Sequence, residues 1–140
     1  MSLTLYHVPR FRSSRSLFMF YELKNTYGDK IPDLNLVQFD LNTFRTNKPK
    51  EFLALNPNGK VPTLSDGDIV MFDSCAICLY LLDTLDIGNL LAPRDKQFRA
   101  KLYKLVRGDI STVNFRFKHV RFKEVFRFKE EFHCSQNFST

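Results

Sequence analysis

The chain has 140 residues, of which 44% are hydrophobic and 26% are charged, and its formal net charge is +6. This balance is typical of a globular domain and excludes wholesale disorder, a collagen-like repeat and a disulfide-stapled scaffold. The apolar runs are shorter than the roughly 20 residues that a membrane span needs, and we read no secretory signal at the N-terminus. The 3 cysteines, an odd number, favour a reducing compartment, so we expect a cytoplasmic location.

The positive charge is concentrated in the C-terminal third of the chain. Residues 1–91 carry nine basic and ten acidic side chains, whereas residues 92–140 carry twelve basic and five acidic ones. A nucleic-acid-binding fold that is basic throughout would not divide in this way. We therefore expect no specific nucleic-acid partner.

The first 85 residues alternate between strand and helix patterns. A strand over 3–6, a helix from Ser13, a second strand over 34–41 and a short helix over 50–55 come first. A third strand over 61–64 and a fourth over 69–72 flank a hairpin turn at 65–68, and a helix then opens at Asp73 and Ser74. The order β-α-β-α-β-β-α predicts an α/β fold with helices on the faces of a small mixed sheet.

The rest of the chain divides into three segments. Residues 86–94 contain Gly88 and Pro93 and are expected to form a linker, and residues 95–113 begin with a basic helix. Residues 114–140 repeat Arg-Phe-Lys three times and hold seven of the 15 phenylalanines. Three interpretations of this basic, Phe-rich tail stay open: a solvated end or one that packs on the domain, a nucleic-acid-binding segment, and a stretch not selected for structure.

The segment NPNGKVPTL, residues 56–64, carries the strongest functional signal. A proline inside a short strand cannot donate to the sheet, so Pro62 is better explained by a special turn, such as one with a cis peptide bond. Such a turn frees the backbone of Val61 to pair with a peptide-like ligand. Asp73 and Ser74 stand at a helix start, where free amides and a hydroxyl suit a carboxylate. Together the two elements suit a small acidic peptide.

The stretch NPNGKVPTL, the Asp-Gly hairpin and MFDSCAICLYLLD together resemble the glutathione-binding half of the cytosolic glutathione S-transferases. The N-terminal TLYHVPRFRSSRSLFMFYEL is similar to the first strand and helix of the serine-type members. The resemblance covers residues 3–85 well and residues 95–113 weakly. It implies a thioredoxin-like domain over 1–85, followed by the first helix of a helical C-terminal domain that is truncated in this sequence.

The resemblance implies a detoxifying transferase that binds glutathione as co-substrate, needs no metal and forms a homodimer. The reaction would be addition of the glutathione thiolate to a small electrophile, or thiol transfer. Activity would be weak, because the family builds its electrophile pocket largely from the second domain. A non-catalytic transferase-like interaction module, of the kind found in translation-factor subunits and regulators, is the alternative.

The resemblance also assigns a glutathione-binding set, namely Lys48, Lys60, Val61, Pro62, Asp73 and Ser74. Val61 would pair through its backbone with the cysteinyl residue, next to the cis-proline. Asp73 and Ser74 would hold the γ-glutamyl amine and carboxylate. Lys60 lies beside the site, and Lys48 falls where relatives contact the glycyl carboxylate. A helix cap is the alternative role for the Asp73-Ser74 pair.

The hydroxyl that activates the thiol is assigned to Ser13, with Ser14 as the second choice. An ungapped comparison places one common serine position on Phe11, which has no hydroxyl. A hydroxyl donor and the positive end of the first helix would favour the thiolate, with help from the charge of Arg12 or Arg15. A simple helix cap is the alternative role for both serines.

The cysteines and histidines give weaker signals. Cys75 and Cys78 form a C-x-x-C pair, but a redox pair of this kind is expected at the start of the first helix, so core packing is the better explanation. The three histidines are scattered along the chain, at His7, His119 and His133. We therefore expect no metal site.

Overall fold

The computed structural model describes residues 3–92, 94–100 and 102–103, and the chain divides into two compact units, one ending at Leu85 and one beginning at Asp86. The first unit holds a four-stranded sheet in the order β2-β1-β3-β4. Its strands are β1 (Leu3–His7), β2 (Leu34–Gln38), β3 (Thr63–Asp66) and β4 (Ile69–Phe72). β1 is parallel to β2 and antiparallel to β3, which is antiparallel to β4. The predicted α/β, thioredoxin-like fold is confirmed.

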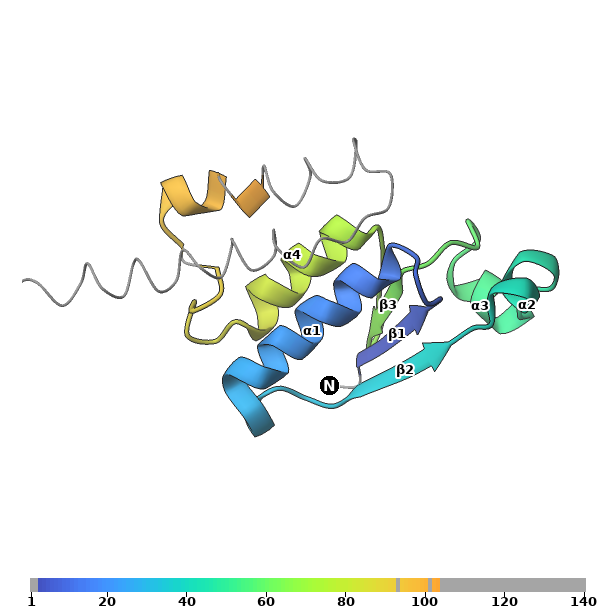
Figure 1. Cartoon of the computed structure of the whole chain (residues 1–140), viewed down its shortest axis with the longest axis horizontal. Coiled ribbons are helices and arrows are strands. Elements are labelled where there is room, and N and C mark those ends of the chain that lie inside the picture. Colours follow the sequence, from blue (N-terminus) through green and yellow to red (C-terminus); the bar gives the residue numbers. More distant parts are fainter. Residues whose placement is uncertain (1–2, 93, 101, 104–140) are drawn as a thin grey trace, which may run out of the picture. The chain divides into compact units, whose positions relative to one another are not determined.

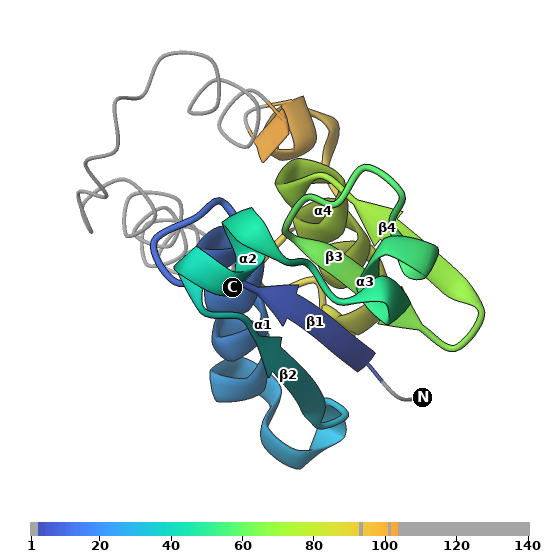
Figure 2. The same ribbon diagram turned by 90° about the vertical axis from the view of Figure 1, so that its right-hand side faces the viewer.

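Two helices, α1 (Ser13–Tyr27) and α4 (Ser74–Leu85), lie side by side against one face of this sheet (Figures 1 and 2). Strand β1 buries every second residue, as expected for a strand with one covered face. The main core between sheet and helices is built from aliphatic and aromatic side chains that are at most 4% exposed: Leu3, Leu5, Met19, Phe20, Leu23, Leu64, Ile77, Leu81 and Leu82. This core fixes where the ends of β1, β3 and β4 lie.

The short helices α2 (Leu41–Thr46) and α3 (Lys50–Leu55) lie beyond the end of β2 (Figure 1). A second apolar cluster takes its buried side chains from these two helices and from the residue that follows β1. We call it the aromatic cluster. Its buried members are Val8, Phe44 and Phe52, and the partly buried side chains packed on them are Tyr6, Phe11, Phe39, Leu41 and Val61. Ring centroids within it lie 5.1–6.1 Å apart, in the range of favourable aromatic contacts. The aromatic cluster thus supports the loops at this end of the sheet.

The second strand is shorter than the sequence predicts, and the expectation for residues 39–41 is wrong. Strand β2 ends at Gln38, and Asp40 caps the helix α2. The alternating apolar residues had predicted that the strand continues through this position. The Asp40 carboxylate accepts hydrogen bonds from the amides of Asn42 and Thr43 at 2.9 and 3.0 Å. These bonds satisfy amides that a helix start leaves free, so the cap decides between strand and helix here.

The β3–β4 hairpin is confirmed, with a shift in its boundaries. Strand β3 begins at Thr63 rather than at residue 61, because the residues before it form a turn. The connecting loop contains only Gly67 and Asp68, and Gly67 has a φ of +57°. Glycine at the first position of a two-residue loop is typical of hairpin turns that follow the twist of the strands.

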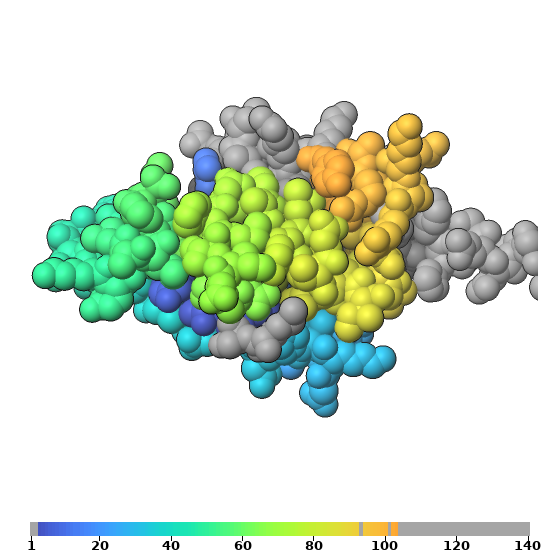
Figure 3. Space-filling view, turned by 180° about the vertical axis from the view of Figure 1, so that it is seen from behind, coloured from blue at the N-terminus to red at the C-terminus, as the bar shows by residue number. Residues whose placement is uncertain are grey.

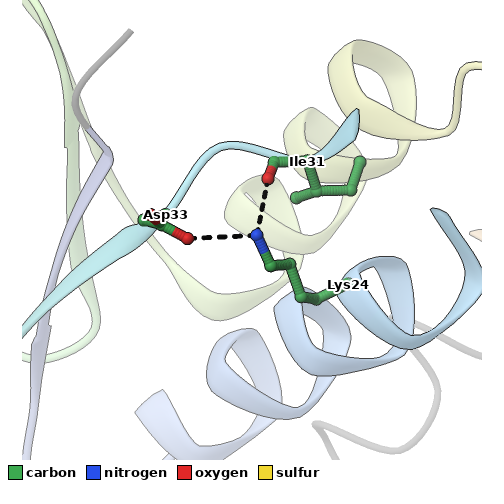
Figure 4. Close-up of polar contacts among 3 residues, drawn as sticks. All are labelled: Lys24, Ile31 and Asp33. Atoms are coloured by element: carbon green, nitrogen blue, oxygen red, sulfur yellow. Dashed lines mark hydrogen bonds and ion pairs between the residues drawn. The ribbon is translucent and has the colours of Figure 1, made fainter. Parts of the chain in front are cut away.

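Lys24 joins the end of α1 to the segment that leads into β2 (Figure 4). Its Nζ donates to the carbonyl oxygen of Ile31 at 2.8 Å and forms an ion pair with Asp33 at 3.0 Å. The Asp33 carboxylate is almost fully exposed, so the ion pair itself adds little stability. The bond to the backbone of Ile31, whose side chain is buried, is the part of the contact that orders the segment.

Seen from behind the view of Figure 1, the β3–β4 hairpin and α4 form a continuous surface next to the α2–α3 segment (Figure 3). Tyr80 on α4 donates a hydrogen bond to Asp66 at the end of β3, at 2.8 Å. Burial and the neighbouring Asp66 carboxylate raise the pKa of Tyr80, which keeps its hydroxyl protonated. This bond fastens α4 to the hairpin.

The second unit begins with a turn organised by Asp86. Its buried carboxylate accepts hydrogen bonds from the backbone amides of residues 90–92, at 2.7–3.2 Å. Residues 96–100 and 102–103 are helical after Asp95, whose Oδ1 caps the amides of Gln97 and Phe98. This helix begins at residue 96, one residue after the expected start, and the expectations for residues 104–113 and for the 114–140 tail lie outside the described residues. Within the described ranges, every helix is too short or too polar to span a membrane.

Candidate functional site

Three segments meet at the end of the sheet where β1 and β4 finish and β3 begins. Thr63 pairs with Phe72 across the hairpin and with Tyr6 on β1, so these three positions share one level of the sheet. Val61 and Pro62 therefore lie just before that level, Asp73 and Ser74 lie just after it on β4, and the β1–α1 loop, residues 8–12, begins next to them. The expected binding elements thus share one edge.

The loop before β3 has the backbone form that its sequence predicts. The peptide bond between Val61 and Pro62 is cis. Val61 is partly buried and packs on the aromatic cluster, and Pro62 is buried. The cluster thus holds the Val61 side chain against the domain.

Asn56 holds this loop in place, a role that the sequence analysis missed. The Asn56 side chain is fully buried, and its Nδ2 donates to the Lys60 carbonyl at 2.9 Å and to Thr63 Oγ1 at 2.8 Å. Thr63 Oγ1 donates in turn to the same Lys60 carbonyl, at 3.0 Å. Asn56 Oδ1 accepts from the amide of Asn58 at 3.1 Å. An asparagine two residues before the amide it binds is the signature of an Asx turn, and the Asn-Pro-Asn-Gly run was the available signal.

Two lysines border the same loop. The Lys48 stem lies over Gly59, such that a Cβ on Gly59 would be 3.0 Å from Lys48 Cδ. Lys48 Nζ stands 5.0 Å from the centroid of the Phe44 ring, a cation–π contact with a member of the aromatic cluster. Lys60 is exposed, with its carbonyl engaged by Asn56 as described. The Lys48 stem thus lies against the loop that leads to Val61, and Lys60 precedes Val61 in the sequence, so both cations favour an anionic ligand near this loop.

Asp73 and Ser74 form the start of α4. Asp73 has a φ of +80°, and its Oδ1 accepts hydrogen bonds from the amides of Cys75 and Ala76 at 2.9 and 3.2 Å. A positive φ is strained for a non-glycine residue, so the surrounding structure must stabilise it, and residues with this strain concentrate at binding sites. The helix-cap interpretation is thus confirmed for Asp73, and it leaves the ligand role open for Ser74.

Ser74 is 2% exposed, and its Oγ has no hydrogen-bond partner within the described part of the chain. A buried hydroxyl without a partner costs free energy, which a ligand atom or water recovers. The hydroxyl sits in the first turn of a 12-residue helix, whose positive end attracts a carboxylate. Ser74 therefore has both the free hydrogen-bonding capacity and the electrostatic setting of an anion site.

Ser13 is fully buried, and its hydroxyl is engaged inside the domain. Its Oγ donates to the Val8 carbonyl at 3.1 Å, accepts from the Val8 amide at 3.2 Å and lies 2.9 Å from Nδ1 of His7. These bonds run back to the end of β1 rather than to the amides of α1, so the helix-cap interpretation is wrong for Ser13. Ser14, the second candidate, is only partly buried.

The loop between β1 and α1 carries an aromatic ring and several cations. Phe11 is partly buried and packs on the aromatic cluster, as Val61 does. Arg12 is exposed and occupies the N-cap position of α1 without a side-chain cap. The charge of Arg15, which is partly buried, acts on the thiols of Cys75 and Cys78. Of the two arginines, Arg15 therefore lies nearer to the start of α4.

The two cysteines of α4 are poor nucleophiles. Burial raises the pKa of the Cys78 thiol to about 12, and Cys78 is 3% exposed, which confirms its packing role. Burial and the Asp73 carboxylate also raise the pKa of Cys75. Thiols of this kind stay protonated at neutral pH. In the ranges that the structure describes, no three His, Cys, Asp or Glu side chains are grouped so as to hold a metal ion.

Fold and candidate site together define a thioredoxin-like domain with a cis-proline loop. Residues 1–83 match the family described as "Glutathione S-transferase, N-terminal domain". The chain therefore belongs to the glutathione S-transferase family, through that domain.

Individual relatives support the same family assignment. The chain is 34% identical to human glutathione S-transferase theta-2 over 91 residues, which are 65% of this chain and 34% of the relative. It is 33% identical to glutathione S-transferase 1 of Manduca sexta over 101 residues, 71% of this chain and 43% of the relative. The chain thus spans less than half the length of these relatives.

Solved structures give the same result. A delta-class glutathione transferase of Nilaparvata lugens superposes with a TM-score of 0.64 at 34% identity, over 79% of this chain and 48% of that one. Human glutathione transferase theta-2, in complex with glutathione and an unknown ligand, superposes with a TM-score of 0.61 at 31% identity, over 77% and 42% of the two chains. The similarity concerns the fold of the first unit and part of the second.

Proposed function

We propose that the first unit binds glutathione across the end of the sheet. The backbone of Val61, next to Pro62, pairs with the cysteinyl residue of the tripeptide. Ser74 Oγ, at the positive end of α4, holds the γ-glutamyl carboxylate, and the exposed Asp73 carboxylate holds its amine. Lys48 and Lys60 attract the glycyl carboxylate. The charged groups of the ligand thus meet groups of opposite charge or hydrogen-bond donors, and its cysteinyl residue meets a free backbone edge.

The observation that carries this proposal is the unpartnered hydroxyl of Ser74. It is buried, it stands at the positive end of α4, and it follows a residue with a φ of +80°. A ligand oxygen or a water can satisfy such a group, and a carboxylate is the ligand that the helix end favours.

For the reaction, we propose addition of the glutathione thiol to a small electrophile, or thiol transfer. In the addition, the thiol gives up its proton, the sulfur electron pair forms the bond to the electrophilic carbon, and the π electrons of that carbon move to its neighbouring atom, which takes up a proton. Where the carbon carries a leaving group, that group departs with its bonding pair, as chloride does from 1-chloro-2,4-dinitrobenzene. Ser14 is the better candidate for the assisting hydroxyl, because the hydrogen bonds of Ser13 are made with His7 and Val8. The proposal includes a homodimer, a cytoplasmic location and the division of the chain at residues 85, 94 and 113.

A non-catalytic interaction module remains the second candidate. The engaged state of Ser13 favours it, since the first-choice hydroxyl is not available to a thiol. Conjugation measured with 1-chloro-2,4-dinitrobenzene separates the two functions. Transfer that is lost in Ser14→Ala supports the enzyme, and glutathione binding without transfer supports the module.

Calorimetric titration of the full chain with glutathione tests the binding proposal. Ser74→Ala removes the buried hydroxyl at the site, and we expect it to reduce affinity at least tenfold, the loss of one hydrogen bond to a charged group. Ser16→Ala is a matched control, because Ser16 Oγ is also buried without a hydrogen-bond partner among the described residues but lies inside α1. Equal affinities for the two variants, or a folded wild-type chain that does not bind, would overturn the proposal.

A further inference from the structure

We propose that Asn58 is a site of spontaneous deamidation, and that this reaction converts the cis-proline loop into a form with lower affinity for glutathione. The effect on affinity rests on the proposed binding of glutathione at this loop, whereas the reaction itself does not. Asn58-Gly59 is the only Asn-Gly pair in the sequence. It stands in the segment 56–60, which leads directly to Val61 and Pro62.

The reaction needs no partner except water. The backbone nitrogen of Gly59 attacks the side-chain carbonyl carbon of Asn58, a new N–C bond forms, and the side-chain nitrogen leaves as ammonia with the proton of the Gly59 amide. Water then opens the resulting cyclic imide at one of its two carbonyls. Opening at one carbonyl gives aspartate, and opening at the other gives isoaspartate, whose backbone runs through the former side chain. One water is consumed and one ammonia is released, without any oxidant or reductant.

The fold imposes the glycine that makes Asn58 reactive. Gly59 has a φ of +57°, and a Cβ on it would lie 3.0 Å from Lys48 Cδ and 3.1 Å from Leu53 Cδ2. Any other residue is therefore strained and crowded at this position. The same lack of a side chain leaves the Gly59 nitrogen unhindered toward the Asn58 side chain, which is exposed. The shape of the loop thus requires the residue pair that favours deamidation.

The turn that begins at Asn56 restrains the reaction in the folded chain. Gly59 is buried, and its amide donates a hydrogen bond to the Asn56 carbonyl at 2.8 Å. The Asn58 amide donates to Asn56 Oδ1 at 3.1 Å. While these bonds hold, the proton of the Gly59 amide is engaged and its nitrogen is turned away from attack. Deamidation therefore requires local opening of residues 56–60, and its rate reports how often this segment opens.

Both products change the loop in a direction that weakens the proposed binding. Aspartate at position 58 adds a negative charge two residues before Lys60, on the loop against which the Lys48 stem lies. This charge opposes the attraction of the two lysines for the glycyl carboxylate. Isoaspartate adds one carbon to the backbone inside the turn, so the hydrogen bonds of Asn56 no longer set the position of Val61.

Peptide mapping by mass spectrometry tests the modification, on the full chain incubated at mildly alkaline pH. Asn47 is the internal control, because it is also exposed but precedes Lys48, whose side chain hinders the same attack. We expect acid to accumulate at Asn58 well before it does at Asn47. The rate at Asn58 should rise about tenfold or more in chain unfolded by guanidinium chloride, because no opening step is then needed.

Asn56→Asp, which weakens the turn, should deamidate at Asn58 at a rate between those of the folded and the unfolded wild-type chain. Equal modification of Asn58 and Asn47 would overturn the proposal. Equal rates at Asn58 in the folded and the unfolded wild-type chain would overturn the restraining role of the turn, and this comparison holds even where the Asn56 variant does not fold.

Calorimetric titration with glutathione tests the effect on affinity. Asn58→Asp reproduces one product, and Asn58→Ala is its matched control, because it removes the same amide without adding a charge. We expect Asn58→Asp to bind roughly threefold more weakly than Asn58→Ala at low salt, with a smaller difference at high salt. Equal affinities would overturn the effect on binding. A folded wild-type chain that accumulates acid at Asn58 but binds no glutathione would overturn the proposed function with that effect, and leave the modification standing.

Discussion

Ser13 and Val8 exchange two hydrogen bonds, with Val8 N donating to Ser13 Oγ at 3.2 Å and Ser13 Oγ donating to the Val8 carbonyl at 3.1 Å. The first turn of α1 is in this way fastened to the end of β1, without any backbone pairing between the two. His7 Nδ1, 2.9 Å from the same oxygen, completes the arrangement. Because its hydrogen-bonding capacity is taken up by these contacts, the Ser13 hydroxyl has a structural role.

Ser13→Ala should therefore destabilise the domain. Removing the hydroxyl leaves the buried amide of Val8 without its acceptor, while the Val8 carbonyl keeps the amide of Phe11 as a donor at 3.2 Å. The unsatisfied amide costs about 1–3 kcal/mol in free energy of unfolding. Urea denaturation followed by circular dichroism measures this cost. Ser14→Ala is the control, and because Ser14 is only partly buried, we expect a change within about 0.5 kcal/mol. A Ser13→Ala variant as stable as the wild type would contradict the structural role.

His7 makes the stability depend on pH. Burial lowers its pKa below the ordinary value of 6.5, so the unfolded chain takes up a proton at a higher pH than the folded chain does. The contribution of neutral His7 is complete above pH 6.5 and is lost as the pH falls through that value toward the lower folded pKa. We expect the midpoint of urea unfolding to fall between pH 7.5 and 5.5.

His7→Gln isolates this effect. Glutamine cannot be protonated, so the variant should lose part of the pH dependence of the unfolding midpoint. Parallel slopes for the wild type and the variant over this range would show that His7 does not titrate with folding.

Features encoded by a few neighbouring residues were predictable from the sequence. The cis bond at Pro62, the hairpin at Asp66-Gly67 and the helix start at Asp73 each depend on local chemistry: a proline ring, a glycine turn and a capping carboxylate. The same locality explains one error. Phe39 and Leu41 continue the apolar alternation of β2, and the cap at Asp40 that ends it is a short-range signal that periodicity alone does not weigh.

Features that depend on how the elements pack against one another were not predictable from the sequence. The sequence placed Ser13 at a helix start, where a cap or a catalytic role is reasonable. Its actual partners, His7 and Val8, become available only when β1 is seated in the sheet and α1 packs over it. The unpartnered state of the Ser74 hydroxyl likewise follows from burial, which the sequence does not state.

Asn56 should be essential for the shape of the binding loop. Asn56→Asp keeps an acceptor for the amide of Asn58 but cannot donate to the Lys60 carbonyl and Thr63. It also places a charge at a fully buried position. We expect a loss of about 2–4 kcal/mol in free energy of unfolding and weaker glutathione binding by the folded fraction.

Asn58→Ala is the control for this loop, because Asn58 contributes only its backbone amide to the Asn56 contact and its side chain is exposed. Its affinity and stability should stay close to wild type. If Asn56→Asp bound glutathione as tightly as Asn58→Ala, the hydrogen bonds of Asn56 would not be what positions Val61.

Gly59 and Gly67 form a matched pair that tests the role of Lys48. Both have a φ of +57°, so alanine at either position costs about 1 kcal/mol through backbone strain. A Cβ on Gly67 meets nothing within 4 Å, whereas one on Gly59 lies 3.0 Å from Lys48 Cδ and 3.1 Å from Leu53 Cδ2. Gly59→Ala should therefore displace the Lys48 stem and weaken glutathione binding several-fold, most clearly at low salt, where the lysine charge is least screened. Gly67→Ala should lose stability but keep its affinity, so equal affinities in the two variants would mean that the position of Lys48 does not matter to the ligand.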